Sequence, residues 1–271
     1  MEAAPEGFPR RERDLIDTRL HLGIFLHEQQ QPEEGSRLIE AALAELAELR
    51  RQQPDNADLA VQEVHSLYNA QLSDYAAGRT EARREKIDRL VQVSSEALER
   101  FDEHQDEFTT SLSNGLTQQV NIARDEGRLD DAVAIAQQRR DLCHAAIEEE
   151  QSISRLHTEL IDADLMLAML FRQLGQPSAA AAPLDEAITI GEQLVAAQPA
   201  VFDYAMLLGR ALYDRGTLHL VSGETEAAVS LLERQIGLLE PWREQQGRTN
   251  DVDPLVGSAK TIVNDIRKGG G

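Results

Sequence analysis

The feature that most constrains how this chain folds is a repeat of about 48 residues. Candidate turn residues recur at intervals of 48, 49, 48 and 48 residues, at Gln30, Gly78, Gly127, Gly175 and Gly223. A small residue stands five positions after four of these, at Gly35, Ala132, Ala180 and Ala228. A spacing held this closely over five copies is the signature of stacked repeats, each of which is one supersecondary unit.

Composition favours helices as the repeating element. The chain is rich in alanine, leucine, glutamate, glutamine and arginine, which are good helix formers. Aromatic residues make up only 4% of its 271 residues, and alternating β-branched runs are missing, so a sheet has little to be built from. We therefore predict an all-α fold: a right-handed solenoid of about five antiparallel helix hairpins with a C-terminal capping helix.

The repeat also predicts the domain organisation. One helical domain is expected over residues 10–268, between flexible ends at 1–9 and 269–271. Its repeats are expected at 10–54, 55–104, 105–151, 152–199 and 200–247, and its capping helix at 254–268. In the fourth repeat, Ala180 and Ala187 stand where the paired helices would meet, and side chains this small let two helix backbones approach closely.

Two residues depart from ordinary helix composition. Pro183 falls about two turns into a predicted helix, where proline removes a hydrogen bond and clashes with the preceding turn. Either the helix kinks there, or residues 178–182 form a separate short turn. Gly115 lies in the middle of another predicted helix and should weaken it by about 1 kcal/mol relative to alanine. We expect that helix to be the least stable of the array, or to be held by a ligand.

The formal net charge of −21 limits the partners that this chain is expected to bind. Nucleic acids and anionic membrane surfaces both reward clustered lysine and arginine, so neither is expected. The single cysteine, Cys143, excludes an internal disulfide and is expected as a small buried residue. The N-terminal stretch lacks the apolar segment of a signal peptide, and no apolar run is long enough to span a bilayer, so a cytoplasmic location is expected.

Motifs for catalysis are missing from the sequence. There is no phosphate-binding loop, no kinase signature, no H-E-x-x-H and no C-x-x-C. Asp162 and Asp164 are two residues apart on a predicted helix and therefore point to different faces, which does not suit a paired-carboxylate site. The run of charged residues at 102–107 is interpreted as a solvated turn rather than a metal site. The chain is therefore expected to be no enzyme and to need no metal or cofactor.

The repeat residues resemble a known family. A small residue five positions after the turn, a large apolar residue near the ninth and alanine at the twelfth are similar to tetratricopeptide repeats, and in the fourth repeat these are Ala180, Leu184 and Ala187. Leu22 and Gly23 before Leu26 match the leucine-glycine pair of that family. The repeat here is two turns longer per helix, and such long repeats resemble the helical regions that follow bacterial serine/threonine kinase domains.

This resemblance implies a binding groove lined by the first helix of each hairpin, at about 13, 10, 6, 3 and 2 residues before the turn. Carried onto this sequence, these positions give a partner-binding set of Tyr68, Tyr75, Asn114, Thr117, Asn121, Arg124, Arg172, Arg210 and Tyr213. Tyrosine offers a rigid apolar face with a polar tip, and arginine binds carboxylates through paired N–H groups. The alternative is that these tyrosines pack between helices and these arginines pair with neighbouring acids.

Two functions are compatible with these features. The first is a non-catalytic protein-interaction scaffold that binds a peptide or a partner helix on its concave face. The second is a sensor module for a small molecule or signal peptide that regulates an associated or fused enzyme, such as a protein kinase.

Overall fold

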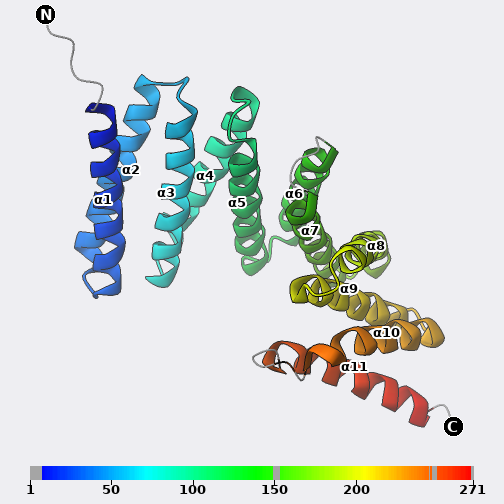
Figure 1. The fold of residues 1–271 in the computed structure, drawn as a ribbon. Coiled ribbons are helices and arrows are strands. Elements are labelled where there is room, and N and C mark those ends of the chain that lie inside the picture. Colours follow the sequence, from blue (N-terminus) through cyan, green and yellow to red (C-terminus); the bar gives the residue numbers. More distant parts are fainter. Residues whose placement is uncertain (1–7, 149–152, 244, 246–248, 270–271) are drawn as a thin grey trace, which may run out of the picture. The chain divides into compact units, whose positions relative to one another are not determined.

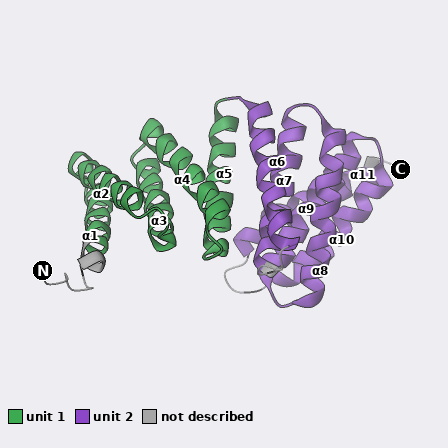
Figure 2. Cartoon of the chain, turned by 90° about the horizontal axis from the view of Figure 1, so that it is seen from above, with its two compact units in different colours: residues 1–126 green, residues 127–271 purple. Residues whose placement is uncertain are grey.

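The computed structural model describes residues 8–148, 153–243, 245 and 249–269, and these residues form eleven α-helices, one short 3-10 helix and no strand (Figure 1). The chain divides into two compact units, residues 1–126 and 127–271 (Figure 2). The first unit holds α1 (Phe8–Glu28), α2 (Pro32–Gln52), α3 (Ala57–Ala76), α4 (Thr80–Arg100) and α5 (Gln105–Asp125). The second holds α6 (Leu129–Glu148), α7 (Ile153–Gln173), the 3-10 helix η1 (Pro177–Ala180), α8 (Ala181–Ala197), α9 (Phe202–Val221), α10 (Thr225–Arg243) and α11 (Thr249–Gly269).

The all-α prediction is confirmed, because consecutive helices pack as antiparallel pairs within each unit. The unit boundary lies between α5 and α6, at the turn predicted inside the third repeat. The single-domain organisation stays a prediction. The expected flexible ends lie mostly outside the described residues, but α1 begins at Phe8 and α11 ends at Gly269.

All five predicted turn residues have the left-handed backbone conformation that ends a helix. The φ angle is 60° at Gln30 and 69°, 76°, 71° and 76° at the four glycines, Gly78, Gly127, Gly175 and Gly223. The following N–H donates back to a carbonyl in the last helical turn, as in the 2.8 Å bond from Gln176 to Phe171. This is the Schellman arrangement, in which glycine is favoured because it has no Cβ to clash.

Two glycines away from the turns allow helices to pack closely. A Cβ on Gly23 of α1 would lie 2.8 Å from the carbonyl oxygen of Gly35 on α2, so the two backbones touch there. A Cβ on Gly115 of α5 would lie 2.6 Å from Leu90 and 2.7 Å from Val91, both on α4. Gly115 therefore has a packing reason that the sequence did not reveal. Whether α5 is the least stable helix stays a prediction.

Pro183 follows the second of its two predicted alternatives. The short 3-10 helix η1 comes first, and α8 starts at Ala181, so that Pro183 lies in the first turn of α8. The first four N–H groups of a helix have no partner within it, so the missing N–H of proline costs no hydrogen bond there.

The apolar core of the second unit includes the small residues that were predicted at the helix contact. Ala180 and Ala187 are fully buried and pack with Leu184 in one cluster that also contains Cys143. The capping helix is longer than predicted, because α11 begins at Thr249 rather than at residue 254. Its buried stripe explains the difference: Val252 lies before Pro254 and packs in the core with α9 and α10.

Candidate functional site

Hollows lie between neighbouring first helices of the pairs, at the same register in both units. In the first unit, two adjoining hollows of about 550 and 360 Å³ lie between α1 and α3 and share His21 and Asn69. In the second unit, a hollow of about 490 Å³ lies between α7 and α9. A residue 13 positions before the turn lines a hollow from each of the four helices: Asp17, His65, Asp162 and Arg210. We call these surfaces the first-helix face of each unit.

A polar network crosses the first-helix face of the first unit. Gln62 of α3 donates to Asp17 at 2.7 Å and accepts from Arg13 at 3.1 Å, both on α1. Arg13 also pairs with Asp58 at 3.5 Å. Apolar surface lies beside this network, since Ile24 and the half-exposed Leu72 line the adjoining hollow. The face therefore combines hydrogen-bonding groups with apolar contact area, as ligand sites do.

Ser73 and His27 both line the hollow of about 550 Å³ between α1 and α3, and their side chains are in contact. His27 Nδ1 is bonded to the hydroxyl of Ser73, and Nε2 lies 3.1 Å from the carbonyl oxygen of Pro32. Arg79 donates to the same Nδ1 at 3.2 Å and also pairs with the buried Asp74. Burial, and then the charge of Arg79, lowers the pKa of His27.

These contacts describe a structural network rather than an activated nucleophile. A catalytic serine needs an accessible hydroxyl and a base whose basicity is raised by a carboxylate. Ser73 is buried, and the guanidinium group of Arg79 weakens His27 as a base. Among the described residues, no three histidine, cysteine, aspartate or glutamate side chains gather where they could hold a metal ion.

One ion pair and one tyrosine line the first-helix face of the second unit, and a second ion pair joins the same two helices outside the hollow. Arg210 of α9 lies 3.9 Å from Asp162 of α7, and Tyr204 lines the same hollow. Burial raises the pKa of Asp162, and Arg139 and Arg210 act against that rise. Burial likewise raises the pKa of Asp214, which pairs with Arg172 at 3.3 Å. Arg210 and Arg172 therefore each pair with a carboxylate whose ionisation is made costly by burial.

The predicted binding residues of the first unit differ in their exposure. Tyr68 is half-buried against an apolar cluster, whereas Tyr75 is 66% exposed, with the Arg83 guanidinium 4.6 Å from its ring centre. On α5, Asn114 is exposed and Asn121 is half-buried.

The remaining predicted residues make mostly local contacts. The Thr117 hydroxyl donates to the carbonyl of Ser113 at 2.8 Å, and Arg124 pairs with the neighbouring Asp125 at 3.2 Å. Tyr213 is half-buried against the core between α9, α10 and α11, and Arg172 and Arg210 pair with acids as described above. Arg210 alone of the predicted set lines one of the hollows described here. The assignment of these nine residues to partner binding stays a prediction.

The hollows extend further along the first helices than the family positions implied. Asp58, Arg155 and Asp203 line them from 20 residues before the turn, and Tyr204 from 19. The two extra turns of each helix supply these positions, which a 34-residue repeat does not have. The 48-residue period was the sequence signal for these extra positions, because a longer helix has a longer exposed surface.

Comparison with known proteins shows the fold but no specific relative. No family model matches the chain, and no curated protein matches it in sequence. The fold is similar to BtubC (BKLC) from P. vanneervenii, with a TM-score of 0.55 and 16% identity over 85% of this chain and 83% of that one. It is also similar to a putative kinesin light chain from P. anserina with nearly identical TPR-like repeats, with a TM-score of 0.51 and 15% identity over 86% of this chain and 99% of that one.

The helix pairs, their left-handed turns and these likenesses together define the class of protein. The chain is a TPR-like helical-repeat protein, with repeats longer than the tetratricopeptide unit. Folds of this kind are typically protein-interaction scaffolds and usually non-catalytic. No helix in the described part of the chain has the length and apolar character needed to cross a bilayer.

Proposed function

We propose that this protein is a non-catalytic interaction scaffold that binds a segment of a partner protein along its first-helix face. The observation that carries the proposal is the recurrence of hollows at one register, 13 residues before the turn, in both units. Within each unit, two neighbouring first helices offer a chain-like ligand contacts at the same register, which is how repeat proteins use their surfaces. The chemistry of the hollows is mixed, so a peptide could place both polar and apolar groups there.

Binding to the second unit can be tested with Arg210 and Tyr204. Their side chains line the α7–α9 hollow, and Arg210 is 52% exposed and weakly held by Asp162 at 3.9 Å. Arg234 on α10 is a matched control, because its side chain is 47% exposed and also pairs with a single acid, Glu192. Partners captured from native lysate would be identified by mass spectrometry, and their affinity for the purified variants measured by calorimetry.

The proposal expects Tyr204→Ala with Arg210→Ala to weaken partner binding at least tenfold, while Arg234→Ala leaves it within about twofold. The sequence-based residues are tested in the same way, with Asn121→Ala and Arg124→Ala expected to weaken binding without changing thermal unfolding. Equal affinity of the face variants and the control would refute the first-helix face as the site. Capture of a small molecule in place of a protein would favour the sensor alternative.

A further inference from the structure

Three large apolar side chains form an exposed stripe on α1, which lies at the edge of the first unit (Figure 1). Leu15, Leu22 and Phe25 are 55%, 48% and 52% exposed, and the exposed Thr18 lies between them. Residues spaced by three, four or seven positions share one side of a helix, so these side chains form a continuous surface, which we call the α1 stripe. Six large apolar side chains are exposed in the described part of the chain, and half of them lie here. A contiguous apolar patch marks an interaction surface, whereas a scattered apolar residue does not.

The register of the α1 stripe shows what this side of a first helix does elsewhere in the chain. Its residues lie 15, 12, 8 and 5 positions before the turn at Gln30. The equivalent residues of the later first helices are Glu63, Ser66, Ala70 and Ser73 in α3, Leu112, Gly115, Gln119 and Ile122 in α5, Leu160, Ala163, Leu167 and Leu170 in α7, and Leu208, Ala211, Arg215 and Leu218 in α9. All of them are buried except Gln119 and Arg215, which are half-buried. The same side is therefore a contact surface in each later first helix and is exposed only in α1.

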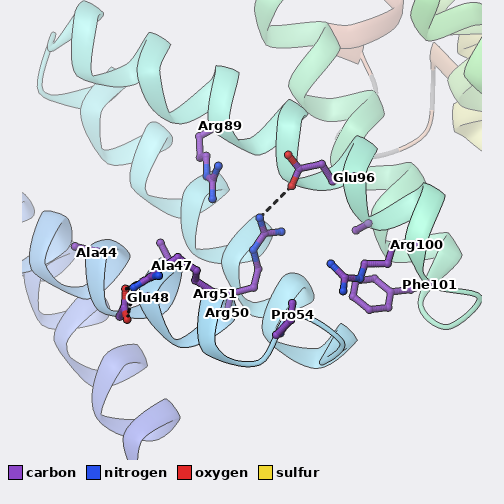
Figure 3. Close-up of a pocket in the computed structure, with 11 residues that line it drawn as sticks. Ala44, Ala47, Glu48, Arg50, Arg51, Pro54, Arg89, Glu96, Arg100 and Phe101 are labelled. Atoms are coloured by element: carbon purple, nitrogen blue, oxygen red, sulfur yellow. Dashed lines mark hydrogen bonds and ion pairs between the residues drawn. The ribbon is translucent and has the colours of Figure 1, made fainter.

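A second helix of the preceding pair covers this side within each unit. In the second unit, a Cβ on Gly191 of α8 would lie 3.1 Å from the Cβ of Leu208 on α9, so the two helices touch at this register. In the first unit, Glu63 of α3 pairs with Arg50 of α2 at 2.8 Å. Figure 3 shows that Arg50 also reaches Glu96 of α4, at 3.1 Å, so that α2 contacts both helices of the following pair. The occupant that fits this side of a first helix is therefore another helix.

The internal contacts also indicate the chemistry of that helix. Where the first helix carries a large apolar residue, the covering helix carries a small one: Leu208 meets Gly191, and Leu160 of α7 shares a core cluster with Cys143 of α6. The α1 stripe likewise carries large apolar residues and no charged one. Its complement is a helix with small, uncharged residues on the contact side, because such residues let two helices approach closely.

We propose that the α1 stripe binds an amphipathic helix of a partner protein, which packs on α1 as the second helix of one pair packs on the first helix of the next. The contact side of the partner helix carries alanine or glycine. A second copy of this chain fits less well, because two α1 stripes would bring large side chains against large ones and each copy carries a net charge of −21. The site is distinct from the first-helix face, since Asp17 and Ile24 line those hollows from another side of α1, and it does not depend on the proposed function of that face.

The probe is a fluorescein-labelled synthetic peptide of residues 177–198, which contain α8 and its small contact residues and stand in for the partner helix. A matched peptide carries Ala187→Glu and Gly191→Glu. Binding to the full chain is measured by fluorescence anisotropy, for the wild type and for Leu22→Gln and Phe25→Gln. The control variant is Val221→Gln, because Val221 is 70% exposed on α9, outside the stripe. Thermal unfolding of all variants is expected to match the wild type, since each altered side chain is exposed.

The unaltered peptide is expected to bind at least about tenfold more tightly than the matched peptide. Leu22→Gln and Phe25→Gln should each weaken binding by about fivefold or more, because each removes apolar area that the helix would bury, and Val221→Gln by less than about twofold. In ¹³C-methyl spectra, the peptide should shift Leu15 and Leu22 but not Leu208 and Leu218, where it could replace α8 itself. Equal binding of both peptides, an equal loss with Val221→Gln, or shifts confined to Leu208 and Leu218 would overturn the proposal. A dimer in sedimentation that Leu22→Gln converts to a monomer would assign the stripe to a second copy and overturn it as well.

Discussion

The buried ion pair between Arg140 and Asp164 yields a prediction that depends on pH in a defined direction. Arg140 of α6 donates from Nε to Asp164 of α7 at 2.7 Å and also bonds Glu186 of α8. Asp164 is fully buried. Burial raises the pKa of Asp164 from 3.8 to about 7, with Arg140 acting against the rise and Glu186 adding to it. His144 Nε2 lies 3.3 Å from the carboxylate of Glu186.

The sign of the pH effect follows from the raised pKa. Because the folded state holds the proton of Asp164 more tightly than the unfolded state, this group stabilises the fold fully below about pH 4. Its contribution is lost as the pH rises to about 7, the folded pKa. A difference of roughly 3 pKa units corresponds to about 4 kcal/mol at most. Above pH 7, where Asp164 is ionised, the folded state therefore depends on Arg140 to stabilise this buried carboxylate.

Arg140→Met should consequently cost far more at high pH than at low pH. At pH 8 the variant leaves an unpaired buried carboxylate, and the free energy of unfolding should fall by about 3–5 kcal/mol. At pH 5 Asp164 is protonated in both proteins, so the loss should be about 1 kcal/mol, from the remaining hydrogen bonds. The assay is urea unfolding followed by the fluorescence of Trp242, the only tryptophan of the chain, which reports on the second unit.

A double-mutant cycle assigns the effect to Asp164. Asp164→Asn cannot ionise, so in its background Arg140→Met should cost the same at pH 5 and pH 8. The contact between Arg140 and Glu186 is lost in both backgrounds, so its contribution cancels in the cycle. An equal loss for Arg140→Met at both pH values in the wild-type background would refute the reasoning, as would a pH-dependent loss that persists with Asn at position 164.

Three further changes test the helix contacts and turns. Gln30→Gly should raise the free energy of unfolding by about 0.5–1 kcal/mol, measured by circular dichroism, because glycine adopts the 60° φ angle at this turn without strain. Ala187→Leu should lower it by about 1–3 kcal/mol, measured by Trp242 fluorescence, because this fully buried helix contact has no room for a larger side chain. Gly115→Ala should also destabilise, by roughly 1–3 kcal/mol, because its Cβ would lie 2.6 Å from Leu90; faster amide hydrogen exchange in α5 is the measurement. Unchanged values in these assays would contradict the corresponding helix packing.

Local backbone signals made most of the fold predictable. The recurring turn residues predicted five left-handed helix ends at their residues, from Gln30 to Gly223, but not the left-handed His104 at the start of α5. The proline rule limited Pro183 to two outcomes, of which the short 3-10 helix is the observed one. Gly115 was misleading, because a glycine inside a helix ordinarily lowers the stability of that helix. The structure shows that a Cβ at this position would lie too close to Leu90 and Val91 of α4.

The candidate sites were less predictable because they depend on residues from several helices. The family register led to Arg210, but Tyr204 lies on the extra turns that the family pattern does not describe. Arg50 of α2 and Arg89 of α4 are far apart in the sequence and come together only because both pair with Glu63 of α3. No spacing rule within one helix relates these three residues.

The sequence by itself therefore determined the helices, their ends and the repeat, because each depends on neighbours within a few positions along the chain. The tertiary structure alone decided which polar groups are buried. Within α7, nothing in the sequence distinguishes Asp164 from other acidic residues. It is buried and paired with Arg140 only because α6 and α8 pack against α7. Burial and charge pairing are properties of packed helices, and together they set the pKa of Asp164.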